Sequence, residues 1–157
     1  MRLSEIIGEK HIKVGLEAED TTEAIEELLD ILISEHEVSL RNRDTILDII
    51  FKRENSVSTG VGGGVAIPHG TVDCVDDIVG AIGISKDGVD FKSFDGDLVH
   101  IVLLLLVPKA KFGKHIKTLA HVARLFIDES VRNKIRCAKS AQDVLAIIDK
   151  AERLIEQ

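Results

Sequence analysis

The chain has 157 residues, of which 45% are hydrophobic and 30% charged, and a net charge of −7. These values are typical of a globular protein of one domain, here residues 1–157. Nucleic-acid binding is disfavoured, because the chain is acidic and lacks Trp and Tyr for base stacking. The longest apolar stretch, residues 101–107, is too short to cross a bilayer, and two distant cysteines favour a reduced, cytoplasmic protein.

The first half of the chain is expected to be helical. Apolar residues recur at the helical spacing through residues 25–32, and Asp20 with Glu23 can cap the start of that helix. A second helix is predicted over residues 42–53, with its isoleucines on one face. Both apolar faces indicate core packing.

The middle of the chain changes character. Residues 55–64 are polar and Gly-rich, which predicts a loop. Residues 65–67 form a short apolar strand that Pro68 ends, because proline has no N–H for the ladder. A further strand is predicted over residues 78–85, followed by a turn at Asp87-Gly88.

The last third predicts one strand and three helices. Residues 98–107 are almost continuously apolar, which indicates a strand buried on both faces of a sheet. Helices are expected over residues 113–127 and 129–136, and Ser140 with Asp143 caps a last helix. The predicted fold class is therefore α/β, a single-domain mixed sheet of about five strands flanked by helices.

His69 is the candidate reactive residue. It follows a strand and lies between Pro68, which restricts the backbone, and Gly70, which leaves room for a donor to approach. A neutral imidazole is a good nucleophile near neutral pH, and its attack on a phosphoryl donor gives a phosphohistidine. The glycines match neither the dinucleotide-binding spacing nor the P-loop spacing, so nucleotide binding is poorly supported.

Phosphoryl transfer needs groups that position the phosphoryl and stabilise its charge. Arg53, the hydroxyls of Ser58, Thr59 and Thr71, and the N–H groups of the Gly-rich segment are the candidates. A metal site that combines His69 with Cys74 or His115 lacks ligand spacing, so neither a metal nor a cofactor is expected.

A longer pattern surrounds His69. Glu54 is followed after six residues by Val61-Gly62 and then by Val65-Ala66-Ile67-Pro68-His69-Gly70. This string resembles the active-site signature of phosphotransferase-system IIA domains of the mannitol/fructose type (EIIA type 2). Arg53 with residues 58–60, residues 88–91 and the helix start at His115 are also similar to that family, and the resemblance covers nearly the whole chain.

The resemblance implies a phosphocarrier. In this family phosphoenolpyruvate charges Enzyme I, which charges the small carrier HPr, which phosphorylates the IIA histidine. By that resemblance His69 is the phosphoacceptor, His115 lies beside it and donates a hydrogen bond to the phosphoryl group, and Arg53 adds a charge-assisted contact. Glu54, Ser58, Thr59, Gly70 and Thr71 form the supporting phosphoryl site.

Three roles stay open. The favoured one is a stand-alone nitrogen-regulatory IIA protein that controls other proteins according to its phosphorylation. The second is a fructose- or mannitol-type IIA protein that passes the phosphoryl group to a cysteine of an EIIB domain. A role of another class is a binding module that keeps the fold without being phosphorylated.

Overall fold

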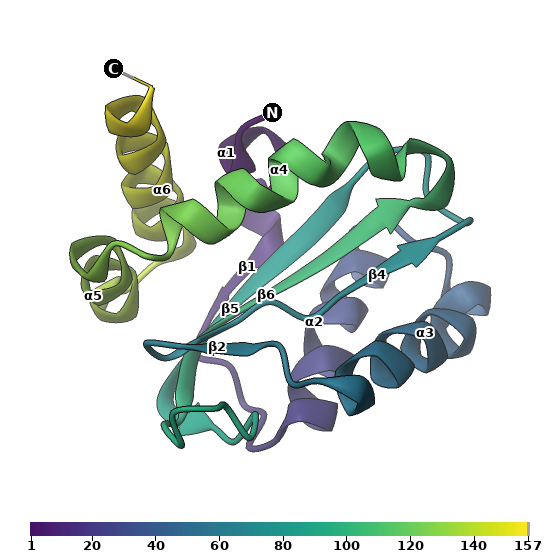
Figure 1. The fold of residues 1–157 in the computed structure, drawn as a ribbon, viewed down its shortest axis with the longest axis horizontal. Helices are drawn as coiled ribbons and strands as arrows, with labels where there is room; N and C mark the ends of the chain where they lie inside the picture. The colour runs from purple at the N-terminus through teal and green to yellow at the C-terminus, as the bar shows by residue number, and fades with distance from the viewer. Residues whose placement is uncertain (157) are drawn as a thin grey trace.

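A computed structural model describes residues 1–156. Its centre is a six-stranded mixed sheet in the order β1-β5-β6-β3-β2, and β4 also pairs with β6 (Figure 1). The strands are β1 (Ile12–Val14), β2 (Gly60–Gly62), β3 (Val65–Ala66), β4 (His69–Val72), β5 (Val79–Val89) and β6 (Val99–Pro108).

Six α-helices cover the sheet in the part of the chain that the structure describes, and none of them is long and apolar enough to cross a membrane. They are α1 (Leu3–Ile6), α2 (Thr21–Ser34), α3 (Arg43–Ser56), α4 (Phe112–Leu125), α5 (Glu129–Cys137) and α6 (Ala141–Ile155). Three short 3-10 helices are η1 (Glu9–His11), η2 (Leu40–Asn42) and η3 (Lys109–Lys111).

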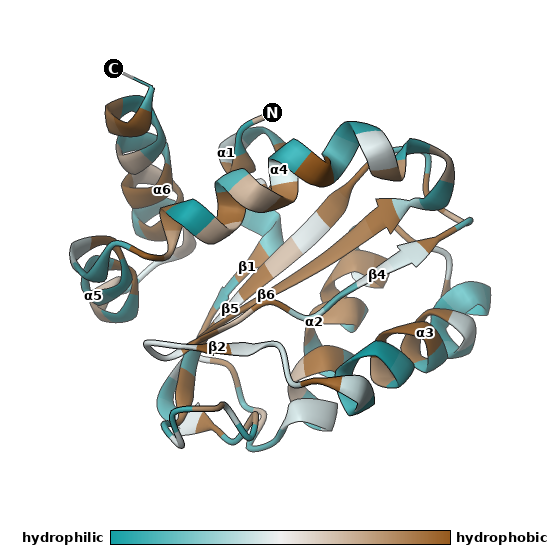
Figure 2. Ribbon diagram, viewed as in Figure 1, coloured by the Kyte–Doolittle hydropathy of each residue, from teal (hydrophilic) through white to brown (hydrophobic). Residues whose placement is uncertain are grey.

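Strand β6 is the axis of the sheet. Its side chains alternate between two apolar layers, with Leu104 and Leu106 on one face and Leu103 and Leu105 on the other. Almost its whole length is hydrophobic (Figure 2). A strand of this kind is stable only when helices cover both faces of the sheet, which is the arrangement found here.

The two faces carry different helices. One apolar layer packs the sheet against α2 and α3, and the other packs it against α1, α4, α5 and α6 (Figure 1). Strands β3 and β4 lie one after the other along the same edge of β6, because β3 pairs with Ile101–Val102 and β4 with Leu105–Pro108. Residues 65–72 therefore run parallel to β6 and pair with it along one edge, except at Ile67-Pro68, where the pairing is interrupted.

Most predicted elements are confirmed. The α/β class, the doubly buried strand and all five predicted helices are present. The caps are present too: Asp20 accepts a hydrogen bond from the Glu23 N–H at 2.9 Å, and Ser140 accepts one from the Asp143 N–H at 3.1 Å.

Two predictions were wrong in detail. Residues 55–64 are not all loop, since α3 extends to Ser56 and residues 60–62 pair with β3 as a strand. Asp87-Gly88 is not a turn between elements, because β5 continues to Val89 through a bulge in which Gly88 has φ +96°. The sheet has six strands, close to the predicted number of about five. Strands β1 and β4 have three and four residues, which is too short to give a clear sequence pattern.

A buried carboxylate joins the two ends of the described chain. The Glu152 side chain is fully buried and accepts hydrogen bonds from the main-chain N–H groups of Leu3 (2.6 Å) and Ser4 (3.0 Å). The His121 Nε2 donates a third bond at 2.6 Å. Burial by itself raises the pKa of Glu152, but the bonds from His121, Ser4 and Leu3 outweigh it and lower the pKa below its usual value.

Glu152→Gln should therefore lower the free energy of unfolding at pH 7 by about 2 kcal/mol, because an amide N–H would face a main-chain N–H. Since the folded-state pKa is lowered, the carboxylate stabilises the fold above its unfolded pKa and loses that contribution as pH falls through the folded value. In urea unfolding between about pH 3 and pH 7, the free energy of unfolding should therefore fall less steeply with decreasing pH in the variant than in the wild type. Glu156→Gln, which removes an exposed pair with Arg2, is the control and should change little. Equal effects of the two variants would contradict this assignment.

Candidate functional site

His69 is the first residue of β4 and pairs in register with Leu105. The next residue, Gly70, lies against α3, where an added Cβ would be 3.1 Å from the Ile49 Cγ2. Because side chains alternate along a strand, His69 and Thr71 point to the opposite face, which α4 covers. Gly70 is thus needed for close packing on one face while the imidazole occupies the other.

The imidazole of His69 has a fixed orientation. Its Nδ1 lies 2.8 Å from the carbonyl oxygen of Ile67, two residues earlier in the chain. A carbonyl oxygen only accepts hydrogen bonds, so Nδ1 carries the proton in the neutral ring. The lone pair is consequently on Nε2, and this half-buried ring presents Nε2 as its nucleophilic atom.

Ile67 is itself held by the Gly-rich segment. Its N–H donates to the Thr59 carbonyl at 3.1 Å. The Thr59 N–H and hydroxyl in turn donate to the Glu54 carboxylate, both at 3.0 Å. We call this series of bonds, from Glu54 through Thr59 and Ile67 to His69, the anchoring chain. It connects the last turn of α3 to the ring of His69.

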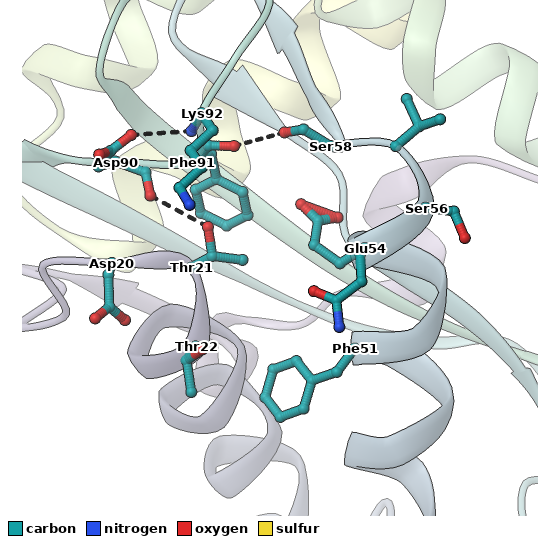
Figure 3. Close-up of a pocket in the computed structure, with 12 residues that line it drawn as sticks. Asp20, Thr21, Thr22, Phe51, Glu54, Ser56, Ser58, Asp90, Phe91 and Lys92 are labelled. Atoms are coloured by element: carbon teal, nitrogen blue, oxygen red, sulfur yellow. Dashed lines mark hydrogen bonds between the residues drawn. The ribbon is translucent and has the colours of Figure 1, made fainter.

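Glu54 and Ser58 also line a polar hollow of about 640 Å³ between the start of α2 and the end of α3 (Figure 3). There the Ser58 hydroxyl donates to the Phe91 carbonyl at 2.6 Å and accepts from the Gly60 N–H at 3.1 Å. Ser58 therefore ties the Gly-rich segment to the turn after β5. This hollow is on the α2/α3 side of the sheet, whereas the His69 ring is on the α4 side.

The other predicted site residues lie as follows. Arg53 is exposed in the last turn of α3, where its Nη1 donates to the Val57 carbonyl at 2.8 Å. Thr71 has an exposed side chain on the same face of β4 as His69. The structure thus places Thr71 on the same side of the sheet as His69. The Arg53 side chain instead bonds to the main chain at the end of its own helix.

His115 is fully buried on the inner face of α4. Its Nε2 donates to the Asp77 carboxylate at 2.8 Å, and its Nδ1 lies 3.5 Å from the Thr118 hydroxyl. The pKa of Asp77 is lowered, first by the hydrogen bond from the Ile78 N–H and then by the bond from His115. His69 and His115 therefore share the α4 side of the sheet, with the Nε2 hydrogen of His115 directed at Asp77.

An apolar surface adjoins the site. Val61, Phe94 and Ile127 are exposed by 55%, 84% and 75%, respectively, and surround a hollow of about 370 Å³. Ile67, whose carbonyl holds His69, forms part of the wall of this hollow. We call these three exposed residues the apolar rim. Large exposed hydrophobic side chains grouped beside a reactive residue are typical of a protein-binding surface.

Two residues of the site were not found by sequence reasoning. Ile67 acts through its main-chain carbonyl, for which the side chain gives no signal. Asp77 is one of three aspartates between β4 and β5, and nothing in their spacing distinguishes the one that contacts His115. Within residues 1–156, no three His, Cys, Asp or Glu side chains are grouped so that they could hold a metal ion.

Comparison with known proteins identifies the family. The sequence profile of the "Phosphoenolpyruvate-dependent sugar phosphotransferase system, EIIA 2" family matches residues 5–151. The chain belongs to this EIIA type-2 family. Proteins of the family are phosphocarriers, and the structure agrees with theirs in fold.

Both nitrogen regulatory proteins and fructose-specific phosphotransferase components are among the similar proteins. A nitrogen regulatory protein of Bradyrhizobium diazoefficiens is 30% identical over 148 residues, which are 94% of this chain and 95% of the relative. A fructose-specific EIIA component of Haloferax volcanii is 37% identical over 126 residues, 78% of this chain and 80% of the relative. The chain spans only 24% of a fructose-specific EIIABC component of Bacillus subtilis, to which it is 29% identical.

One solved structure supports the nitrogen-regulatory branch of the family, and a second agrees in fold. The nitrogen regulatory protein IIA-Ntr of Neisseria meningitidis superposes with a TM-score of 0.84 at 34% identity, covering 93% of this chain and 98% of the other. The mannitol IIA protein of Escherichia coli superposes with a TM-score of 0.76 at 24% identity, covering 90% and 98%, and this likeness concerns the fold alone.

Proposed function

We propose that this EIIA type-2 protein accepts a phosphoryl group from phosphorylated HPr on Nε2 of His69 and carries it as a phosphohistidine. The observation that supports this most strongly is the 2.8 Å bond from Nδ1 to the Ile67 carbonyl. It leaves Nε2 unprotonated in the neutral ring and directs the reaction to that atom.

In the proposed step, the Nε2 lone pair attacks the phosphorus atom of the donor. A phosphorus–nitrogen bond forms, and the bond from phosphorus to the donor breaks, with its electron pair leaving on the donor. Nδ1 keeps its proton throughout, so the phosphorylated ring carries a positive charge that the Ile67 carbonyl stabilises. The protein mainly positions the groups, as expected for a loose transition state.

Three side chains have proposed roles around the phosphoryl group. Thr71, on the same face as His69, donates its hydroxyl to a phosphoryl oxygen. The Nε2–H of His115, which donates to the Asp77 carboxylate, can also donate a hydrogen bond to a nearby phosphoryl oxygen. Arg53 adds positive charge after releasing the Val57 carbonyl.

We favour a nitrogen-regulatory role, in which phosphorylation decides whether the protein binds a regulated partner. The nitrogen regulatory relatives that match over almost their full length support it. The alternative is a sugar-transport EIIA protein that passes the phosphoryl group to an EIIB cysteine, and the fructose-specific relatives favour this. A purely binding module is less consistent with a histidine whose nucleophilic nitrogen is left unprotonated.

We propose that the apolar rim receives HPr and the acceptor. It adjoins Ile67, so a partner seated on it would bring its own phosphoryl-bearing residue toward His69. The protein carries a net charge of −7, and local apolar contact gives a docking force that this charge does not oppose.

Incubation with phosphoenolpyruvate, Enzyme I and HPr should add one acid-labile phosphoryl group to the protein, measured as intact mass. His69→Ala should add none, while His100→Gln, a half-buried histidine on β6, should be phosphorylated normally. His115→Ala should still be phosphorylated, at a rate lower by about a hundredfold. Wild type that stays unmodified, beside a control IIA that is modified, would favour the binding module.

Phe94→Ser should raise the KM for phosphorylated HPr about tenfold and leave kcat nearly unchanged, because it removes an apolar contact from the docking surface. Leu154→Ser is the matched control, since Leu154 is also exposed, by 60%, but lies on α6. Steady-state rates at two salt concentrations measure both effects. If Phe94→Ser leaves the KM unchanged and the KM rises steeply with salt concentration, docking depends on charge instead.

A further inference from the structure

A second hollow, away from His69, has a distinct chemical character. It measures about 640 Å³ and lies where β1 and β5 meet α5 and the segment before α6. Residues from four parts of the chain line it: residues 14–15, residues 84–86, His100, and residues 133 and 136–139. Its volume is within the range of small-molecule binding sites.

The charged side chains of this hollow are all cationic. Lys86, Arg136 and Lys139 line it, and no Asp or Glu is among its lining residues. Within residues 1–156, none of these three cations takes part in an ion pair, although the chain has an excess of seven negative charges. We call Lys86, Arg136 and Lys139 the cationic triad. Three unneutralised cations from β5, α5 and the next loop form a local concentration of positive charge in an acidic protein.

A ring nitrogen adds a neutral polar group to the wall of this hollow. The Nδ1 of His100 lies 2.9 Å from the Ser85 carbonyl and carries the proton in the neutral ring, so Nε2 holds the lone pair and can accept a hydrogen bond from a ligand hydroxyl. The hollow therefore offers point charges and a forked guanidinium to an anionic group, and an accepting ring nitrogen to a ligand hydroxyl.

Much of the remaining wall is apolar, although Ser85 and Asn133 also line it. Val14, Ile84 and Ala138 contribute hydrophobic surface, and Gly15 leaves the entrance free, since an added Cβ would meet nothing within 4 Å. A bare inorganic ion would use only the charged side of such a hollow. A ligand with an anionic end and a less polar body would use both sides.

We infer that this hollow binds a small organic phosphate, with the phosphoryl group on the cationic triad and the sugar or base against Val14, Ile84 and Ala138. A phosphomonoester carries close to two negative charges and three acceptor oxygens, which suits two lysines and an arginine. The site is separate from His69 and does not depend on its phosphorylation.

Amide chemical shifts in ¹H–¹⁵N spectra at low salt test this inference, with AMP and ribose 5-phosphate as probes. Both should shift the amides of residues 14–15, 84–86 and 136–139, and the affinity for AMP should exceed that for adenosine and for inorganic phosphate. The double variant Arg136→Gln/Lys139→Gln should weaken AMP binding at least tenfold, since hydrogen bonds to charged groups contribute about 1.5–3 kcal/mol. Its spectrum also reports whether it is folded.

The control is Lys52→Gln/Lys117→Gln, which removes the same charge from exposed positions on α3 and α4 and should bind AMP as the wild type does. His69→Ala should bind equally well, so the outcome is independent of the phosphocarrier proposal. Three results would overturn the inference: no shifts with either probe at about 10 mM, equal weakening in the control variant, or inorganic phosphate binding as tightly as AMP.

Discussion

The hydrogen bond from His69 Nδ1 to the Ile67 carbonyl is the interaction on which the proposed chemistry depends. It joins a reactive ring to the main chain only two residues away, so the orientation of the ring depends on the position of the Ile67 carbonyl. Ile67 is held by Thr59, and Thr59 by the carboxylate of Glu54 in the last turn of α3. A helix end thus determines which nitrogen of a histidine on a neighbouring strand is free to react.

The sheet supplies the frame for this arrangement. β3 and β4 pair with the same edge of β6, and the gap at Ile67-Pro68 is where the carbonyl of Ile67 is free to accept from a side chain. Proline at position 68 has no N–H, and its carbonyl accepts from Leu105 at 3.0 Å, which keeps the interrupted edge attached to β6. β6 in turn is fixed by apolar layers on both faces. The packing of the core and the orientation of the ring are therefore linked through a few main-chain bonds.

Sequence reasoning reached the fold class, the five longer helices and the buried strand, because their apolar periodicity is strong and continuous. It also selected His69 from the long pattern around it. It could not find the Ile67 carbonyl or the contact between His115 and Asp77, since main-chain acceptors and contacts between residues 38 apart leave no local pattern. Arg53, Ser58 and Thr59 were selected as phosphoryl contacts; their side chains bond to protein groups in this structure, and their contacts with a phosphoryl group stay a prediction.

The protonation of the His69 ring tests the central claim most directly. Long-range ¹H–¹⁵N correlation spectra of the unphosphorylated protein above about pH 8 distinguish the two neutral tautomers, and His69→Gln assigns the signals. The account predicts a protonated Nδ1 and an unprotonated Nε2 in wild type, with the two forms mixed in Glu54→Gln, where the support of Ile67 is weakened. A wild-type ring protonated on Nε2 would contradict it, because the lone pair would then face the Ile67 carbonyl and the proposed nucleophile would be blocked.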